Sequence, residues 1–128
     1  MYFSLSVSKS DTKITYERSE DGQFNFMIKI KITTVLTHTD IPANMLKQDV
    51  ISSYEQCAEA QLKESIEAAV QRVQLEYESD VFLLGHYIYN TNNRLWHEVK
   101  DNWNEFFRNA RVVAEPEISI INTDYKKL

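Results

Sequence analysis

The chain has 128 residues and a mass of 15.0 kDa, enough for one compact domain but too little for two of ordinary size. With 43% hydrophobic and 26% charged residues it can bury a core, so compositional disorder is excluded. Lys and Arg number 14 against 19 Asp and Glu, and the resulting net charge of −5 argues against binding to nucleic acid and against docking by charge on an anionic membrane.

The first third of the chain alternates with a period of two, which is typical of half-buried strands. In residues 3–8 apolar side chains alternate with serine, and the stretch lacks the basic and long apolar regions of a signal peptide. Lys9-Ser10-Asp11 is a candidate turn before a second short strand around Ile14 and Tyr16. Asp21-Gly22, between two alternating runs, then predicts a hairpin turn.

The third predicted strand is the clearest element. Its even positions from Phe24 to Ile32 are apolar, and after Thr33-Thr34 the alternation slips to Val35-Leu36, where we expect a bulge, a sharp twist or the end of the strand. The opposite face is polar enough to stay wet or to meet a partner. It carries Asn25, Lys29, Lys31 and Thr33, together with Ser4 and Ser6 from the first strand.

Thr39-Asp40-Ile41-Pro42 ends the strand, and a long amphipathic helix is predicted from about Tyr54 to Glu78. At 1.5 Å per residue it is roughly 35 Å long. We expect its acidic residues to be solvated and its apolar stripe to cover the even face of the third strand. The stripe consists of Ala58, Leu62, Ile66, Val70, Val73 and Tyr77.

Asp80 is a good N-cap for the next element, Val81–Tyr89, which is apolar nearly all round. Periodicity alone does not separate a buried helix from a buried strand here, and we favour the helix. The polar turn Asn90–Asn93 precedes a second amphipathic helix from Arg94 to Phe107, with Asn109 as a left-handed C-cap. The apolar side of that helix consists of Leu95, Trp96, Val99, Trp103, Phe106 and Phe107.

A closing strand alternates Val112, Ala114, Ile118 and Ile120 with polar residues. Pro116 lacks an amide hydrogen, so this strand is expected at a sheet edge or with a bulge. The whole order, β-β-β-α-α-α-β, predicts an α+β fold. We expect a single domain over residues 1–128, with one curved, mostly antiparallel sheet of about four strands and the helices packed on one face.

Reactive groups are sparse. His38, His86 and His97 have no metal-ligand spacing, and His86, in an apolar run, is expected to be a core or boundary residue. Cys57 is expected to be packed or inert, because neighbouring glutamates oppose a thiolate. With only two glycines no phosphate-binding loop is possible. The sequence thus predicts no catalytic, metal or cofactor-binding residues and no enzyme.

Trp96 and Trp103 are seven residues apart, which places them on nearly the same face of one helix, about 10 Å apart along its axis. We favour two core anchors over residues that rim a partner groove. An alternative is a small-ligand domain with an apolar pocket between the long helix and the sheet. Such a pocket would be lined by Phe24, Phe26, Tyr87, Trp96 and Trp103.

An ordered set of residues in the C-terminal half resembles a known family. The run from Glu78 to Gly85 is followed by Leu95-Trp96, by Trp103-Asn104-Glu105-Phe106-Phe107 and by a Val/Ile strand. This order is similar to that in the C-terminal domain of the Ger(x)C (GerAC-type) family, the C subunits of bacterial spore germinant receptors. The matching positions are Asp80, Phe82, Gly85, Trp96, Trp103 and Phe106.

The resemblance covers nearly the whole chain and departs from the family pattern at two places. Leu83 stands where the family often has a Gly, which predicts a less tightly turned backbone, and Asn122-Thr123 follows the last strand where Gly is usual. Asn also tolerates positive φ.

The resemblance implies a non-catalytic interaction or signal-relay domain in nutrient-triggered germination. Its implied partners are the integral-membrane A- and B-type receptor subunits and the other domains of a longer chain. Family members are lipoproteins on the outer face of the spore inner membrane. Any membrane attachment is then expected through a lipid anchor outside these residues, because Cys57 lies within a predicted helix.

Overall fold

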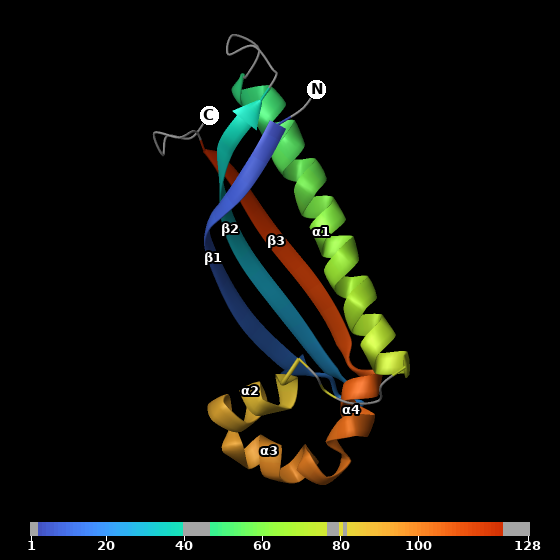
Figure 1. Cartoon of the computed structure of the whole chain (residues 1–128). Helices are drawn as coiled ribbons and strands as arrows, with labels where there is room; N and C mark the ends of the chain where they lie inside the picture. The colour runs from blue at the N-terminus through green and yellow to red at the C-terminus, as the bar shows by residue number, and fades with distance from the viewer. Residues whose placement is uncertain (1–2, 40–46, 77–79, 81, 122–128) are drawn as a thin grey trace. The chain divides into compact units, whose positions relative to one another are not determined.

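The computed structural model describes residues 3–39, 47–76, 80 and 82–121, without the side chains of residues 3, 4 and 37–39. The fold is α+β, as predicted (Figure 1). Its elements in chain order are β1 (Phe3–Arg18), β2 (Phe24–Thr39), α1 (Gln48–Glu76), α2 (Leu84–Thr91), α3 (Asn93–Val99), the 3₁₀ turn η2 (Lys100–Asn102), α4 (Trp103–Asn109) and β3 (Arg111–Ile121).

The sheet has three strands in the order β1-β2-β3, so the expected count of about four is too high by one. The candidate turn at Lys9-Ser10-Asp11 does not form, because this stretch contains neither Gly nor Pro and continues the extended backbone of β1. β1 and β2 are antiparallel and meet at a hairpin in which the Ser19 amide donates to the Gln23 carbonyl and Gly22 has φ 89°. β3 runs parallel to β2, so the sheet is mixed (Figure 1).

The chain forms two compact units, which we describe separately. Unit 1 comprises Met1–Lys13, Lys29–Glu64 and Ala114–Leu128, and unit 2 comprises Ile14–Ile28 and Ser65–Val113. β1, β2, α1 and β3 contribute residues to both. That the chain is one domain stays a prediction.

In unit 1, α1 begins at Gln48, earlier than predicted, because Ile51 and Glu55 extend its buried side by one turn. The Glu59 carboxylate accepts a hydrogen bond of 2.8 Å from the Ile118 amide, and the Glu55 carboxylate accepts one of 2.8 Å from the Ile120 amide. The expectation that the acidic residues of this helix are all solvated was therefore wrong. These two carboxylates are acceptors for the backbone of β3.

A lysine and a proline account for the remaining backbone positions along the same edge of β3. The Lys63 ammonium donates to the Ala114 carbonyl at 3.0 Å. Residues 114, 118 and 120 are all even-numbered, so their backbone groups point to the same side of the strand. Pro116 occupies the even position between them and has no N–H to satisfy there. The predicted edge position of this strand is confirmed.

β2 keeps its alternation through the point where a break was expected. Thr34 follows the apolar even positions onto the buried face, where 6% of its surface is exposed, and its hydroxyl donates to the Ser119 carbonyl at 3.1 Å. A threonine is tolerated there because its polar group has a partner. The strand therefore continues to Thr39 and does not end at Thr33-Thr34.

The predicted half-burial of the first strand was wrong. Leu5 is 38% exposed and Val7 is 63% exposed, and residues 5–13 are exposed throughout. In unit 1 the helix makes its polar contacts along β3, at the other end of the strand order. β1 therefore has β2 as its only neighbour in the sheet as described.

Unit 2 holds the main core. Its buried apolar residues come from β2, α2, α3 and α4 and from the residue that precedes β3. α2 confirms the helix favoured for the apolar run after Asp80. The core consists of Phe24, Phe26, Leu84, Ile88, Val99, Trp103, Phe107 and Ala110.

The second amphipathic helix is not continuous. After Val99 (φ −114°) the chain makes the η2 turn, and α4 begins at Trp103. Asn109 is not a left-handed C-cap, since it is the last residue of α4 and Ala110 after it is extended. Asp40–Pro42, Tyr77 and Asn122-Thr123 lie outside the described residues.

Candidate functional site

Asp80 is the polar centre of the motif residues in unit 2. Its carboxylate accepts hydrogen bonds from the amides of Leu84 at 3.0 Å and Gly85 at 2.7 Å. These amides open α2 and have no partner within the helix, so a carboxylate there both pairs and favourably complements the helix dipole. A third bond of 2.8 Å comes from Nε1 of Trp103. The carboxylate thus joins α2 to α4.

Position 85 must be a glycine because the indoles of Trp96 and Trp103 both lie close to its backbone. A Cβ atom at this position would lie 2.6 Å from Nε1 of Trp103 and 2.9 Å from Cζ3 of Trp96. Real Cβ atoms essentially never come within 3.0 Å of a neighbour, and both rings are held in place by packing. The absence of a side chain is therefore what lets α2 meet the two tryptophans.

The two indoles pack against each other, with ring centroids 5.7 Å apart at an interplanar angle of 65°. The expected separation of about 10 Å along one helix was wrong, because η2 puts Trp96 and Trp103 on different helices. The Trp103 ring, 6% exposed, also packs nearly perpendicular to Phe24 and Phe26, with ring centroids 5.4 Å and 6.2 Å apart. These edge-to-face contacts are the geometry that aromatic quadrupoles favour.

Phe106 closes the aromatic cluster on the side of the hairpin. Its ring lies 5.7 Å from that of Phe24, and the Arg18 guanidinium lies 5.4 Å from the centroids of both rings. The same guanidinium pairs with Glu98 at 3.9 Å. Sequence reasoning missed Arg18, whose only signal was its position at the end of a strand next to a predicted hairpin turn.

Gln74 was also missed. It is buried on α1, and its side-chain amide donates to the carbonyls of Phe107 and Ala110, each at 2.8 Å. The Phe107 carbonyl lies in the last turn of α4 and also accepts from the Ala110 amide, while the Ala110 carbonyl lies directly after the helix, so Gln74 joins α1 to the C-terminal end of α4. A glutamine four residues after Val70, in line with the apolar stripe, was the available signal.

Phe82 differs from the other predicted motif residues because it is 41% exposed, and its neighbour Leu83, where the sequence departs from the family pattern, is 64% exposed. Leu83 has φ 59° and ψ 35°, the only positive φ of a non-glycine residue among those described. The prediction of a less tightly turned backbone at Leu83 was wrong: the chain keeps the left-handed turn although a leucine stands there. The hydrogen bonds of Asp80 to the two following amides hold that turn.

Comparison with known proteins agrees with this arrangement. The family model "Spore germination B3/ GerAC like, C-terminal" matches residues 1–124. The chain belongs to this family. Spore germination protein B3 of Bacillus subtilis (strain 168) is 27% identical over 119 residues, which are 92% of the chain and 32% of that protein. The chain thus spans about a third of the length of this relative.

A solved structure gives the same fold. The crystal structure of the GerBC protein superposes with a TM-score of 0.78 at 22% sequence identity, over 95% of this chain and 42% of that one. It supports the α+β fold of this Ger(x)C-family domain. No helix in the described part of the chain is long and apolar enough to cross a membrane.

The reactive side chains of this Ger(x)C-family domain do not converge. His86 is exposed and stacks on Tyr89, so the expectation of a core or boundary histidine was wrong. His97 and Cys57 are exposed, and the side chain of His38 lies outside the described residues. Within the described residues no three His, Cys, Asp or Glu side chains gather as metal ligands do.

The residues expected to line the alternative apolar pocket pack against other aromatic side chains. Phe24 and Phe26 are fully buried and pack on Trp103, while Tyr87 meets Tyr16 with centroids 6.2 Å apart. A hollow of about 410 Å³ does lie beside Trp96 and Trp103, but the rest of its lining is polar and contains no histidine. The aromatic residues described here therefore pack as a core.

Proposed function

We propose that this chain is a non-catalytic docking and signal-relay domain of a germinant receptor C subunit, acting in nutrient-triggered spore germination. Its partners are the integral-membrane A- and B-type subunits and the other domains of the full-length chain. The full-length protein is held at the outer face of the spore inner membrane by a lipid anchor outside the described residues. Membership of the spore germination family supports this assignment.

The observation that carries the proposal is how the motif carboxylate is used. Both oxygens of Asp80 accept hydrogen bonds, from two backbone amides and from the Trp103 indole. A general base must reach a substrate proton, and a nucleophile must reach a substrate atom. A carboxylate whose two oxygens both accept hydrogen bonds from within the domain is suited to a structural role, holding the local backbone in one conformation.

The shape it holds presents Phe82 and Leu83 to solvent. Aromatic residues are enriched at the energetic centres of protein interfaces, and a side chain fixed before binding loses little conformational entropy on association. The turn that carries them is held directly at Leu84 and Gly85 by Asp80. We therefore assign the contact with a receptor subunit to this exposed pair.

The test is binding of the full-length C subunit to the purified A and B subunits in detergent. The variant Phe82→Ser/Leu83→Asn removes both apolar side chains and leaves a residue that tolerates positive φ at position 83. Leu75→Ser is the matched control, because Leu75 is 78% exposed on α1 in the same unit. We expect at least about tenfold weaker binding for the double variant, the scale of one interface hot spot, and no change for the control. Equal binding by all three proteins would contradict the proposal.

A further inference from the structure

The two edges of the sheet are treated differently in unit 1. The outer edge of β3 is closed by Glu55, Glu59 and Lys63, which bond to its backbone, and by Pro116. β1, at the other end of the strand order, has residues 5–13 exposed. Exposed edge strands are templates for pairing with another chain, and proteins normally blunt them. Among the described residues, the edge of β3 is therefore covered, whereas the edge of β1 is exposed and can pair with another strand.

The open edge carries a regular row of backbone groups. The amide of Ser19 donates to Gln23 across the hairpin, so the odd-numbered residues of β1 bond to β2 and the even-numbered ones face outward. In unit 1 the residues whose backbone groups face outward, and whose side chains are described, are Ser6, Ser8, Ser10 and Thr12, all exposed; the Ser8 hydroxyl itself donates back to the Thr33 carbonyl of β2 at 3.3 Å. The small side chains present no steric obstacle to a neighbouring strand.

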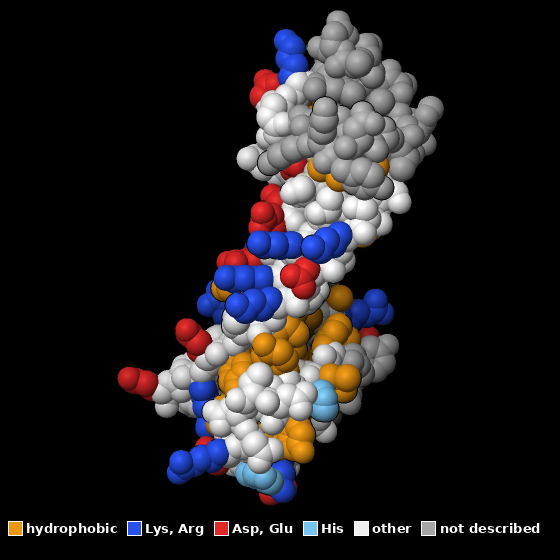
Figure 2. All heavy atoms as spheres, turned by 90° about the vertical axis from the view of Figure 1, so that its left-hand side faces the viewer, with side chains coloured by type: hydrophobic (Ala, Val, Ile, Leu, Met, Phe, Trp, Pro, Cys, Tyr) orange, Lys and Arg blue, Asp and Glu red, His pale blue; other side chains and the backbone are white. Residues whose placement is uncertain are grey.

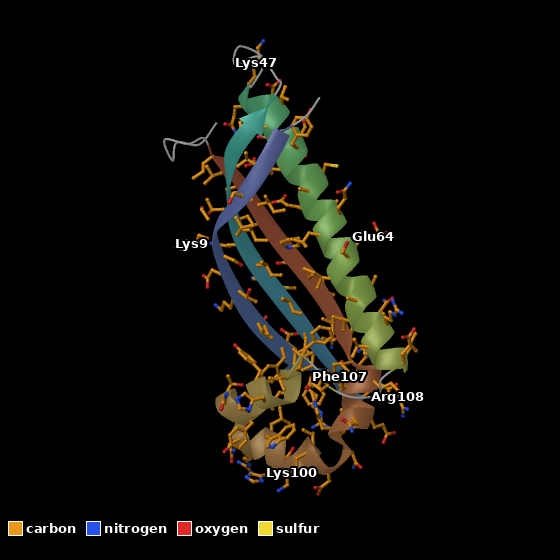
Figure 3. The ribbon with its side chains drawn as sticks, in the orientation of Figure 1. Lys9, Lys47, Glu64, Lys100, Phe107 and Arg108 are labelled. Atoms are coloured by element: carbon orange, nitrogen blue, oxygen red, sulfur yellow. The ribbon has the colours of Figure 1, made fainter. Side chains whose placement is uncertain are left out.

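We propose that the occupant of this edge is a second copy of the chain, with the two β1 strands antiparallel about a twofold axis at Ser10. This register places Lys9 directly opposite Asp11 of the second copy, and Asp11 opposite its Lys9. Odd positions of β1 form the closely spaced, non-hydrogen-bonded pairs of such a ladder, where opposite charges interact best. Lys9, labelled in Figure 3, extends from β1 on the side away from α1.

Charge complementarity favours this register over the one with the axis at the next residue. Moving the axis to Asp11 would set Asp11 against itself and Lys9 against Lys13, and like charges directly opposite each other are destabilising. With the axis at Ser10, Val7 lies opposite Lys13, whose aliphatic stem can cover it. Basic and acidic side chains are interspersed on the face seen from the β1 side in Figure 2, as a self-complementary surface requires.

The test is sedimentation equilibrium of the chain at rising concentration. Lys9→Asp puts two pairs of aspartates face to face, and Asp11→Lys puts two pairs of lysines face to face. We expect each variant to dimerise at least about tenfold more weakly than the parent chain, as the loss and reversal of two ion pairs requires. An equimolar mixture of the two variants restores both attractive pairs, so the heterodimer should form more strongly than either variant associates with itself.

Lys13→Asp is the control, because it makes the same change of net charge as Lys9→Asp but faces Val7. It loses only the aliphatic cover over Val7 and reverses no ion pair, so it should weaken dimerisation less than Lys9→Asp does. The mixing experiment requires both variants to be folded, since only folded chains restore the dimer. A parent chain that stays monomeric at millimolar concentration, or a mixture that does not associate, would overturn the proposal and leave the edge to a strand of different sequence.

Discussion

At Gly85 the space for a side chain is occupied by two indoles. Gly85→Ala would place its Cβ 2.6 Å from Trp103 and 2.9 Å from Trp96, so α2 or both rings must shift. We expect the free energy of unfolding to fall by about 2–3 kcal/mol, as for an overpacked core. Urea denaturation measures it. Gly22→Ala is the control: its Cβ comes no closer than 3.6 Å to a neighbour, and only its φ of 89° opposes the change, at about 1 kcal/mol.

At Leu83 we predict the opposite effect, a substitution that stabilises the chain. It holds φ 59° while 64% exposed, so a glycine would relieve the backbone and lose little packing. Relief of about 1–2 kcal/mol, offset by the greater freedom of glycine in the unfolded chain, leaves Leu83→Gly more stable by about 0.5–1 kcal/mol. Thermal unfolding of Leu83→Gly and Leu83→Ala side by side tests this. If alanine stabilises as much as glycine, the turn is not the source of strain.

At the scale of elements, α1 stabilises β3 through side chains that bond to backbone. Glu55 is 8% exposed and pairs with the Ile120 amide. Glu55→Ala leaves that amide without its partner, and we expect a loss of about 1–3 kcal/mol and faster hydrogen exchange at Ile120. Glu55→Gln keeps an acceptor oxygen and should lose less. Unchanged exchange at Ile120 in the alanine variant would show that the bond does not hold the strand.

Element types followed from periodicity, while breaks and polar contacts did not. The long helix and the closing strand have strong local signals, and both are present. Asp80 was predicted as the N-cap of the next helix, but the N-cap is Leu83, and Asp80 bonds to the first amides of α2 from three residues before that N-cap. The η2 turn was missed because the residues around it keep a helical pattern through Trp103. Which of the predicted motif residues touch each other depends on that turn. Gln74 and Arg18 act through partners far along the chain, which no local pattern reports.

At the scale of the whole molecule, four elements run through both compact units. We therefore expect the 128 residues to unfold in one transition, as a single domain does. Both tryptophans lie in unit 2, so their fluorescence follows that unit, whereas circular dichroism follows all the helices. The two urea curves should coincide. Separate midpoints would show two domains that unfold independently.

The central claim is that the motif aspartate and indole hold the fold together. A double-mutant cycle on the unfolding free energy, with Asp80→Ala, Trp103→Phe and the pair, tests it most directly, because the hydrogen bond of 2.8 Å between these two side chains is lost in each single variant. We predict that each single change destabilises the chain and that the pair loses less than the sum, by about 1 kcal/mol or more of coupling. Single variants as stable as the parent chain would contradict the claim and place both residues in a role outside the fold.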